Sequence, residues 1–184
     1  MRRLLLSVST ALVLLAGALL STANADLADR KAMTNAEARN AMNAAIAEAT
    51  KNGWKMVIAV ADDSGRLIML ERMDGAPTIS VEIAPGKART AALFGRSSAL
   101  LEEAIKTRPA IGTAGHLLLQ GGLPIMVNGL VIGSVGVSGA TSQQDEQVAA
   151  AGIAATISPI SFTSACWVIW MSQGWRSRSV GARV

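Results

Sequence analysis

The sequence has few of the side chains that build disulfides and metal centres. Its 184 residues include one cysteine, one histidine and no tyrosine. Cys166 has no second cysteine with which to form an internal disulfide. His116 has no second histidine, which excludes paired-histidine zinc motifs such as H-E-x-x-H. We therefore expect a fold that is stabilised by packing, and we predict no catalytic residue.

The charge balance does not favour nucleic acid as a partner. The chain carries 17 basic and 13 acidic residues, a net charge of +4. Five of the basic residues lie near the two ends, so residues 26–157 hold 12 basic residues against all 13 acidic ones. A body that is nearly neutral has no basic stripe that could follow a phosphate backbone. We expect no nucleic acid to bind.

The first 25 residues have the pattern of a secretory signal peptide. Two arginines at positions 2 and 3 precede an apolar run at 4–20, and the tripeptide ANA at 23–25 is typical of a cleavage site. The alternative is a membrane anchor, since a run of about 17 residues reaches the lower limit for a span. We expect cleavage after Ala25, a periplasmic or secreted protein, and no membrane span after cleavage.

The periodicity of apolar residues predicts alternating helices and strands. A capping box at 34–37 opens the first helix, and the turn residues DDSG and NG each join two strands. We predict helices at 35–51, 79–94 and 97–107, strands at 54–61, 66–72, 123–127 and 129–140, and a last helix that ends near 157. Pro85-Gly86 is expected to kink or split the second helix. Either Thr141 with Gln144 or Ser142 with Asp145 caps the last one.

This order of elements predicts an α+β fold. An antiparallel sheet of four to five strands, with helices packed on one face, would bury the apolar runs. Such an architecture is profilin-like or PAS-like. We expect one domain over residues 26–157, after the signal peptide at 1–25 and before an atypical C-terminal tail at 158–184 that shows no periodicity.

Four sequence blocks resemble the GlcG/HbpS-like heme-binding family. They are IAVADDSGRLIMLERMDGA at 58–76, KARTAALFGR at 87–96, GGLPIMVNGLVIGSVGVSGA at 121–140 and QDEQVAAAGI at 144–153. The resemblance implies an exported protein that binds heme for capture, storage or sensing and assembles into a homo-oligomer. Because some members are described as heme-degrading, an enzyme that degrades heme or acts on a small organic acid is the alternative. A sensory or interaction module without heme, paired with an exported sensor partner, is the third.

The resemblance directs attention to residues that could hold heme as a cofactor. Heme needs an apolar slot, cations for its propionates and, in many proteins, an iron ligand. His116 is the candidate metal ligand because imidazole is a good iron donor. The other candidates are Met73 at a strand exit, the propionate partners Arg72, Lys87, Arg89 and Arg96, and the hydroxyl of Thr90. Each has a structural alternative as core filler, solvated cation or helical threonine.

The glycine-rich run GLVIGSVGVSGA at 129–140 raises a separate question. Its four glycines would let another surface approach the backbone closely. That surface is a flat porphyrin, a helix of the same subunit or a neighbouring subunit, and the sequence leaves the three open. The run matches neither G-x-G-x-x-G nor the P-loop, so nucleotide binding is not favoured.

Overall fold

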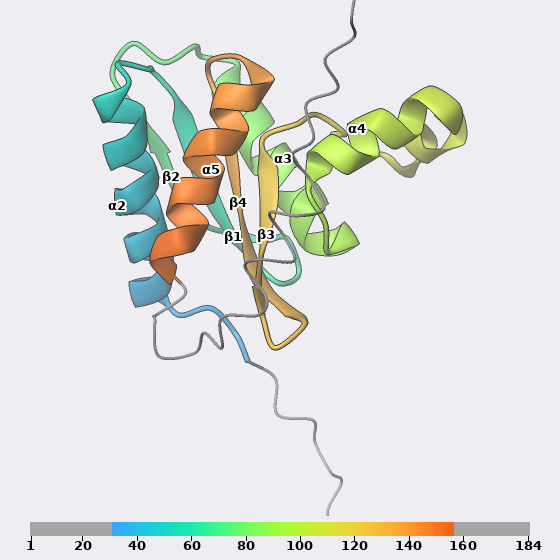
Figure 1. The fold of residues 1–184 in the computed structure, drawn as a ribbon, viewed down its shortest axis with the longest axis horizontal. Helices are drawn as coiled ribbons and strands as arrows, with labels where there is room; N and C mark the ends of the chain where they lie inside the picture. Colours follow the sequence, from blue (N-terminus) through green and yellow to red (C-terminus); the bar gives the residue numbers. More distant parts are fainter. Residues whose placement is uncertain (1–30, 157–184) are drawn as a thin grey trace, which may run out of the picture. The chain divides into compact units, whose positions relative to one another are not determined.

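A computed structural model describes residues 31–156 of the chain (Figure 1). The signal peptide and the tail predicted from the sequence lie outside these residues. The elements are α2 (Asn35–Lys51), β1 (Val57–Asp62), β2 (Leu67–Arg72), α3 (Ser80–Phe94), α4 (Ser98–Thr107), the 3-10 helix η1 (Pro109–Ala114), β3 (Gly122–Val127), β4 (Leu130–Ser138) and α5 (Ser142–Thr156). None of the helices within residues 31–156 combines the length and the apolar character that crossing a bilayer requires.

The strands form one antiparallel sheet in the order β2-β1-β4-β3. Each outer strand is joined to an inner one by a hairpin. In the β3–β4 hairpin, Asn128 and Gly129 both have positive φ, 53° and 80°, which is the conformation that an Asn-Gly turn favours. The predicted α+β class is therefore confirmed.

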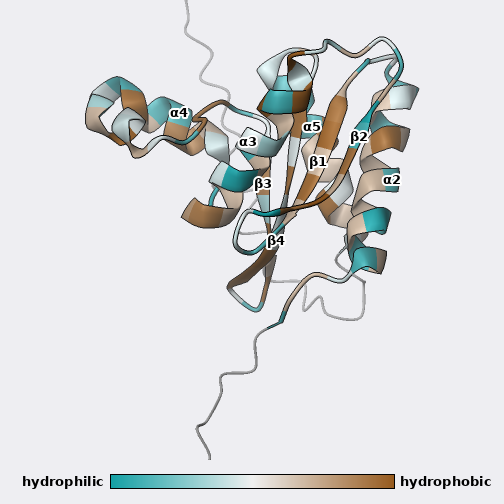
Figure 2. Ribbon diagram, turned by 180° about the vertical axis from the view of Figure 1, so that it is seen from behind, coloured by the Kyte–Doolittle hydropathy of each residue, from teal (hydrophilic) through white to brown (hydrophobic). Residues whose placement is uncertain are grey.

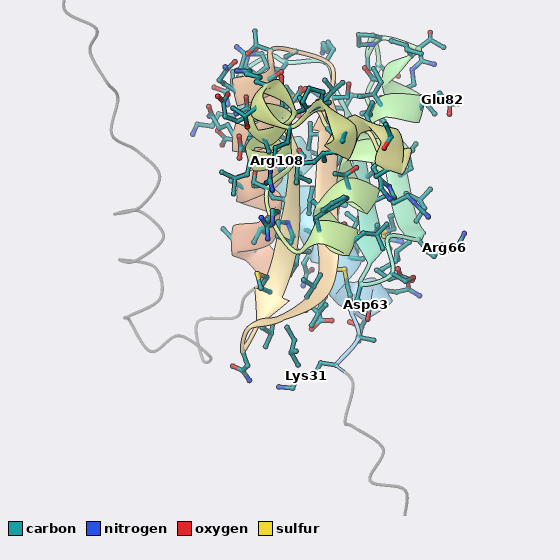
Figure 3. All side chains as sticks on the ribbon, turned by 90° about the vertical axis from the view of Figure 1, so that its right-hand side faces the viewer. Lys31, Asp63, Arg66, Glu82 and Arg108 are labelled. Carbon is teal, nitrogen blue, oxygen red and sulfur yellow. The ribbon has the colours of Figure 1, made fainter. Side chains whose placement is uncertain are left out.

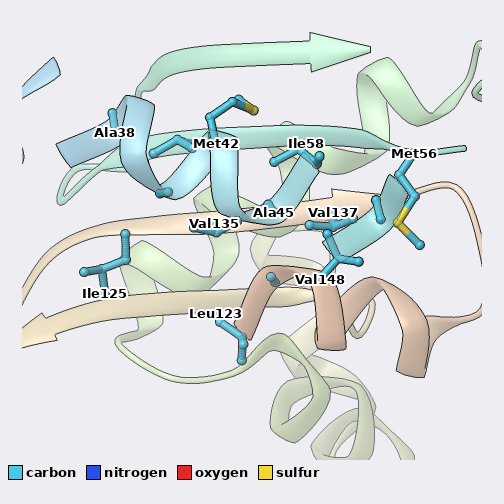
Figure 4. Close-up of a cluster of buried hydrophobic side chains, with 14 of the residues drawn as sticks. Ala38, Met42, Ala45, Met56, Ile58, Leu123, Ile125, Val135, Val137 and Val148 are labelled. Atoms are coloured by element: carbon cyan, nitrogen blue, oxygen red, sulfur yellow. The ribbon is translucent and has the colours of Figure 1, made fainter. Parts of the chain in front are cut away.

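The expectation that the helices would cover one face of the sheet is wrong. Helices α2 and α5 pack on one face and α3 packs on the other (Figure 1). The first face contributes a large apolar core built around Ile58, Val135 and Val137 (Figure 4). The second contributes a smaller cluster in which β1 meets the alanines of α3. The cause lies in β1, whose run VIAVA is apolar on both faces (Figure 2) and requires cover on both.

Helix α3 also differs from the prediction, because it is one continuous helix across Pro85. Ala84 and Ala88, on either side of that proline, lie directly against β4. A Cβ atom added to Gly136 would lie 2.2 Å from the Ala84 carbonyl oxygen and 2.4 Å from the Ala88 nitrogen. This contact between backbones holds both halves of α3 on the sheet, and the packing outweighs the hydrogen bond lost at Pro85.

The same contact answers the question that the glycine-rich strand raised. At Gly136 the approaching surface is a helix of the same chain, α3. At Gly139 the close neighbours are the carbonyl oxygen of Lys55, 2.5 Å from an added Cβ, and Met56. The middle and the end of the glycine run therefore make room for the chain's own backbone.

Of the two predicted caps for α5, the structure shows the first. The Gln144 N–H donates to Thr141 Oγ1 at 3.4 Å, and the Thr141 N–H donates to Gln144 Oε1 at 3.1 Å. This reciprocal pair is a capping box. Asp145 is thereby left for a different role inside the protein.

Candidate functional site

The outer row of α3 forms the floor of a shallow surface feature that we call the α3 trough. Its residues are Glu82, Gly86, Arg89 and Leu93, which recur at helical spacing on the side opposite the sheet. Leu93 is 44% exposed. Gly86 contributes no side chain, so a side chain from another segment can lie directly on the helix at this point. The β1–β2 hairpin, on which Asp63 and Arg66 are labelled, borders the trough along one side (Figure 3).

That hairpin forms the first wall. A Cβ atom on Gly65 would lie 2.9 Å from Arg89 Cγ, so the turn sits directly against the Arg89 side chain. Between turn and helix is a largely apolar hollow of ≈ 150 Å³, lined by Ala61, Gly65, Leu67, Pro85, Gly86 and Arg89. Pockets that enclose organic ligands usually measure roughly 300–1,000 Å³. A flat ligand would therefore lie on this surface and not inside it.

The segment His116–Leu117 forms the second wall. The Leu117 side chain fills the space above Gly86, where an added Cβ would lie 3.0 Å from Leu117 Cδ2. The Thr90 hydroxyl donates to the Leu117 carbonyl at 2.9 Å. The half-buried His116 ring stands edge-on to Phe94, with centroids 5.5 Å apart and planes at 88°. These contacts place the imidazole near the C-terminal end of α3.

Lys87, a predicted propionate partner, lies inside the protein. Its side chain is 4% exposed, and its Nζ donates to Asp145 Oδ2 at 2.7 Å and to the Val137 carbonyl at 2.9 Å. Asp145 Oδ1 also accepts from the Ala140 N–H at 3.1 Å. An added Cβ at Gly121 would lie 2.9 Å from Lys87 Nζ, so this glycine makes room for the pair. The pair ties α3 on one face of the sheet to α5 on the other.

The environment of this pair predicts a pH effect. Burial raises the pKa of Asp145 above its ordinary value of 3.8, and the hydrogen bond and charge of Lys87 oppose part of that rise. The folded protein therefore binds this proton more tightly than the unfolded chain. Asp145 accordingly contributes stability below the unfolded pKa, and that contribution is lost as the pH rises through the folded pKa.

We expect a carbon NMR titration of the Asp145 carboxyl to give an inflection above 3.8, and Lys87→Met to move it further upward because the counter-charge is removed. Asp62 is the internal control. Burial alone would raise its pKa, but hydrogen bonds from Arg66 and Ser64 bring it below 3.8. An Asp145 inflection at or below that of Asp62 would contradict the prediction.

The structure places Arg72 and Met73 apart from the trough's His116 end, and Arg96 near it. Arg72 donates to the Ala76 carbonyl, at 3.0 Å from Nη2, and so fixes the loop before α3. Met73 packs against the larger core. Arg96 is exposed just after the C-terminal end of α3. Because α3 has 15 residues and is about 22 Å long, Arg72 and Arg96 lie near opposite ends of the helix.

Sequence reasoning missed the parts of the site that depend on distant contacts. Leu67, Gly86 and Leu117 carry no functional pattern, and only the fold assembles them into a floor and two walls. The sequence does show that Asp145 is an acidic residue near the start of a helix. That position predicts only a favourable interaction with the helix dipole, not an ion pair with Lys87. Among residues 31–156, no three His, Cys, Asp or Glu side chains gather in a way that could hold a metal ion.

Comparison with known proteins gives consistent matches. The family described as "Haem degrading protein HbpS-like" matches residues 33–154. Protein GlcG of Escherichia coli K12 is 50% identical over 93 residues, which cover 50% of this chain and 69% of GlcG.

Two solved structures have the same fold. A double mutant of Streptomyces reticuli HbpS superimposes with a TM-score of 0.68 at 31% identity, covering 73% of this chain and 94% of HbpS. The crystal structure of a PduOC:heme complex has a TM-score of 0.63 at 25% identity, covering 67% of this chain and 94% of that one.

Proposed function

This chain belongs to the HbpS-like family, and on that premise we propose that it is an exported heme-binding protein that holds heme on the α3 trough, for capture, storage or sensing. One observation carries the proposal. The fold packs the Leu117 side chain onto Gly86 and places Leu67 and Arg89 beside it, so an apolar surface carries a cation within it and an imidazole at one end. A flat apolar molecule with carboxylates and a metal has matching chemistry.

The residues present fit such a group. His116 would ligate the iron, since its ring is half-buried and positioned by Phe94. Arg89 and Arg96 would donate charge-assisted hydrogen bonds to the propionates. When bound, heme supplies redox and oxygen chemistry through its iron. The proposal does not use Lys87, Thr90, Arg72 or Met73, because their polar groups or side chains already have partners inside the protein.

A homo-oligomer belongs to the same proposal. The hollow of ≈ 150 Å³ leaves most of a flat ligand uncovered on one chain. A second copy lying across the trough would remove the exposed ligand face and Leu93 from water. The proposal that the protein is exported rests on the signal-peptide pattern at 1–25. We further propose that a second exported protein binds the heme-loaded form and acts as its sensor partner.

The test is a hemin titration of residues 26–184. We expect a saturable Soret shift, a changed Soret position in His116→Ala because the iron loses its ligand, and roughly tenfold weaker binding in Arg89→Gln because a propionate loses a charged donor. Arg39→Gln on α2, exposed on the other side of the sheet, is the matched control and should bind like the parent. A His116→Ala spectrum identical to that of the parent would remove His116 from the site.

The family is described as haem degrading, which favours heme degradation as the second candidate function. Adding a reductant and oxygen to the saturated complex separates the two. A Soret band that persists supports binding alone, whereas bleaching with release of iron supports turnover. If hemin causes no spectral change at all, both heme functions are rejected and an interaction module remains.

A further inference from the structure

We infer that Glu146 is a positioning residue that holds the segment carrying His116 against α3. The inference rests on the proposed function, because it assigns to Glu146 the task of placing the iron ligand. Glu146 lies near the N-terminal end of α5, directly after the first turn, on the opposite face of the sheet from α3. Its effect on His116 therefore passes through the chain between α3 and β3.

That connection is a long excursion from the body of the fold. Residues 97–120 leave the end of α3, form α4 and η1 as a projecting arm, and return to β3 (Figures 1 and 2). Both ends of the arm meet at Glu146. Ser97 Oγ, at the outgoing end, donates to Glu146 Oε1 at 2.9 Å. Gln120 Nε2, at the returning end, donates to Glu146 Oε2.

The returning end is held at further points around His116. The Gln120 N–H donates to Glu102 Oε2 at 2.6 Å, and Thr90 fixes the Leu117 carbonyl. His116 precedes Leu117 directly and lies four residues before Gln120. Its ring contacts only one edge partner, Phe94, among the aromatic residues of the described chain. The placement of the ring therefore depends on how firmly residues 117–120 are held.

The chemistry of Glu146 suits this task. Within residues 31–156 the ion pairs at 4.0 Å or less are Lys51–Glu48, Lys87–Asp145 and Lys106–Glu103, so no cation engages Glu146 there. A partly buried carboxylate with two neutral donors makes two charge-assisted hydrogen bonds. The two neighbouring carboxylates of α5 therefore bind different parts of the protein. Asp145 binds α3 through Lys87, and Glu146 binds both ends of the arm.

The test uses His116 as its own reporter. It is the single histidine of the chain, so its imidazole resonances are assigned without ambiguity. In heme-free Glu146→Ala we expect these resonances to lose the ring-current shift from Phe94 and the amides of 116–120 to exchange roughly tenfold faster, because two charge-assisted bonds are lost. Gln147→Ala is the matched control, since it removes a bond of α5 to Glu48 on α2 and should leave His116 unchanged.

A second measurement links the tether to heme. The hemin complex of Glu146→Ala should have a Soret position shifted toward that of His116→Ala, while Gln147→Ala keeps the parental spectrum. If Glu146→Ala does not fold, Gln120→Ala is measured in its place. This variant removes the Gln120 donor to Glu146 and should change the His116 resonances and the Soret position in the same direction.

The outcomes are distinguishable. Unchanged His116 resonances and exchange rates in Glu146→Ala overturn the inference, as does a parental Soret band in that variant. If the parent protein binds no hemin but the resonances still move, the tether stands and the proposed function fails.

Discussion

Replacing Lys87 by methionine is expected to lower the free energy of unfolding by about 3–5 kcal/mol, measured by urea denaturation. The Asp145 side chain is 3% exposed and therefore almost inaccessible to water. The substitution removes the counter-ion of this buried carboxylate. It also removes the donor to the Val137 carbonyl. A buried charge without a partner costs far more than the intact pair contributes, because the pair's attraction only offsets the desolvation of both groups.

A double variant separates the unpaired charge from the loss of packing. Lys87→Met with Asp145→Leu removes both charges and should recover most of the lost stability. Lys106→Met is the control, because Lys106 and Glu103 form an exposed pair, and its urea midpoint should stay unchanged. If Lys87→Met unfolds at the parental midpoint, the pair does not carry the link between α3 and α5.

Gly136→Ala is expected to destabilise the fold by more than about 3 kcal/mol, at or above the usual range for overpacking. The added methyl group would meet the Ala84 carbonyl oxygen at 2.2 Å and the Ala88 nitrogen at 2.4 Å. Both are backbone atoms of α3, so no side chain can rotate away and the whole helix must move off the sheet. Thermal unfolding with circular dichroism and a hemin titration would measure the loss, since the same movement would displace the α3 trough.

Gly129→Ala provides the comparison. Gly129 has a φ of 80°, and an added Cβ would meet nothing within 4 Å. Its cost should therefore be the strain of one left-handed residue, about 1–2 kcal/mol. If Gly136→Ala were no worse than Gly129→Ala, the close contact between α3 and β4 would not be a constraint on the fold.

The sequence correctly predicted the elements whose structure depends on residues close together in the chain. The capping box at Thr34 and Glu37 is present in α2, with the Thr34 N–H donating to Glu37 Oε2 at 2.7 Å. The predicted helix at 35–51 has the observed bounds of α2. The Asn128-Gly129 turn is equally local, because its φ angles depend on two residues.

Local signals failed at Pro85 and in the layer arrangement. A proline within a helix predicts the loss of one hydrogen bond. The packing of Ala84 and Ala88 depends on Gly136, which comes 52 and 48 positions later in the chain. The unbroken apolar run of β1 indicates that both faces of the sheet are covered, whereas the prediction placed all helices on one face.

The sequence by itself determined the family, the α+β class, the cap of α2 and the hairpins, because each depends on residues that are adjacent or recur at a fixed spacing. The tertiary structure alone decided that Lys87 pairs with Asp145 across 58 positions, that His116 lies against Phe94 and α3, and that Glu146 closes the arm. These are contacts between elements that lie far apart in the chain. The packing of helices and strands determines which residues meet in these contacts. The spacing of residues along the sequence does not predict that packing.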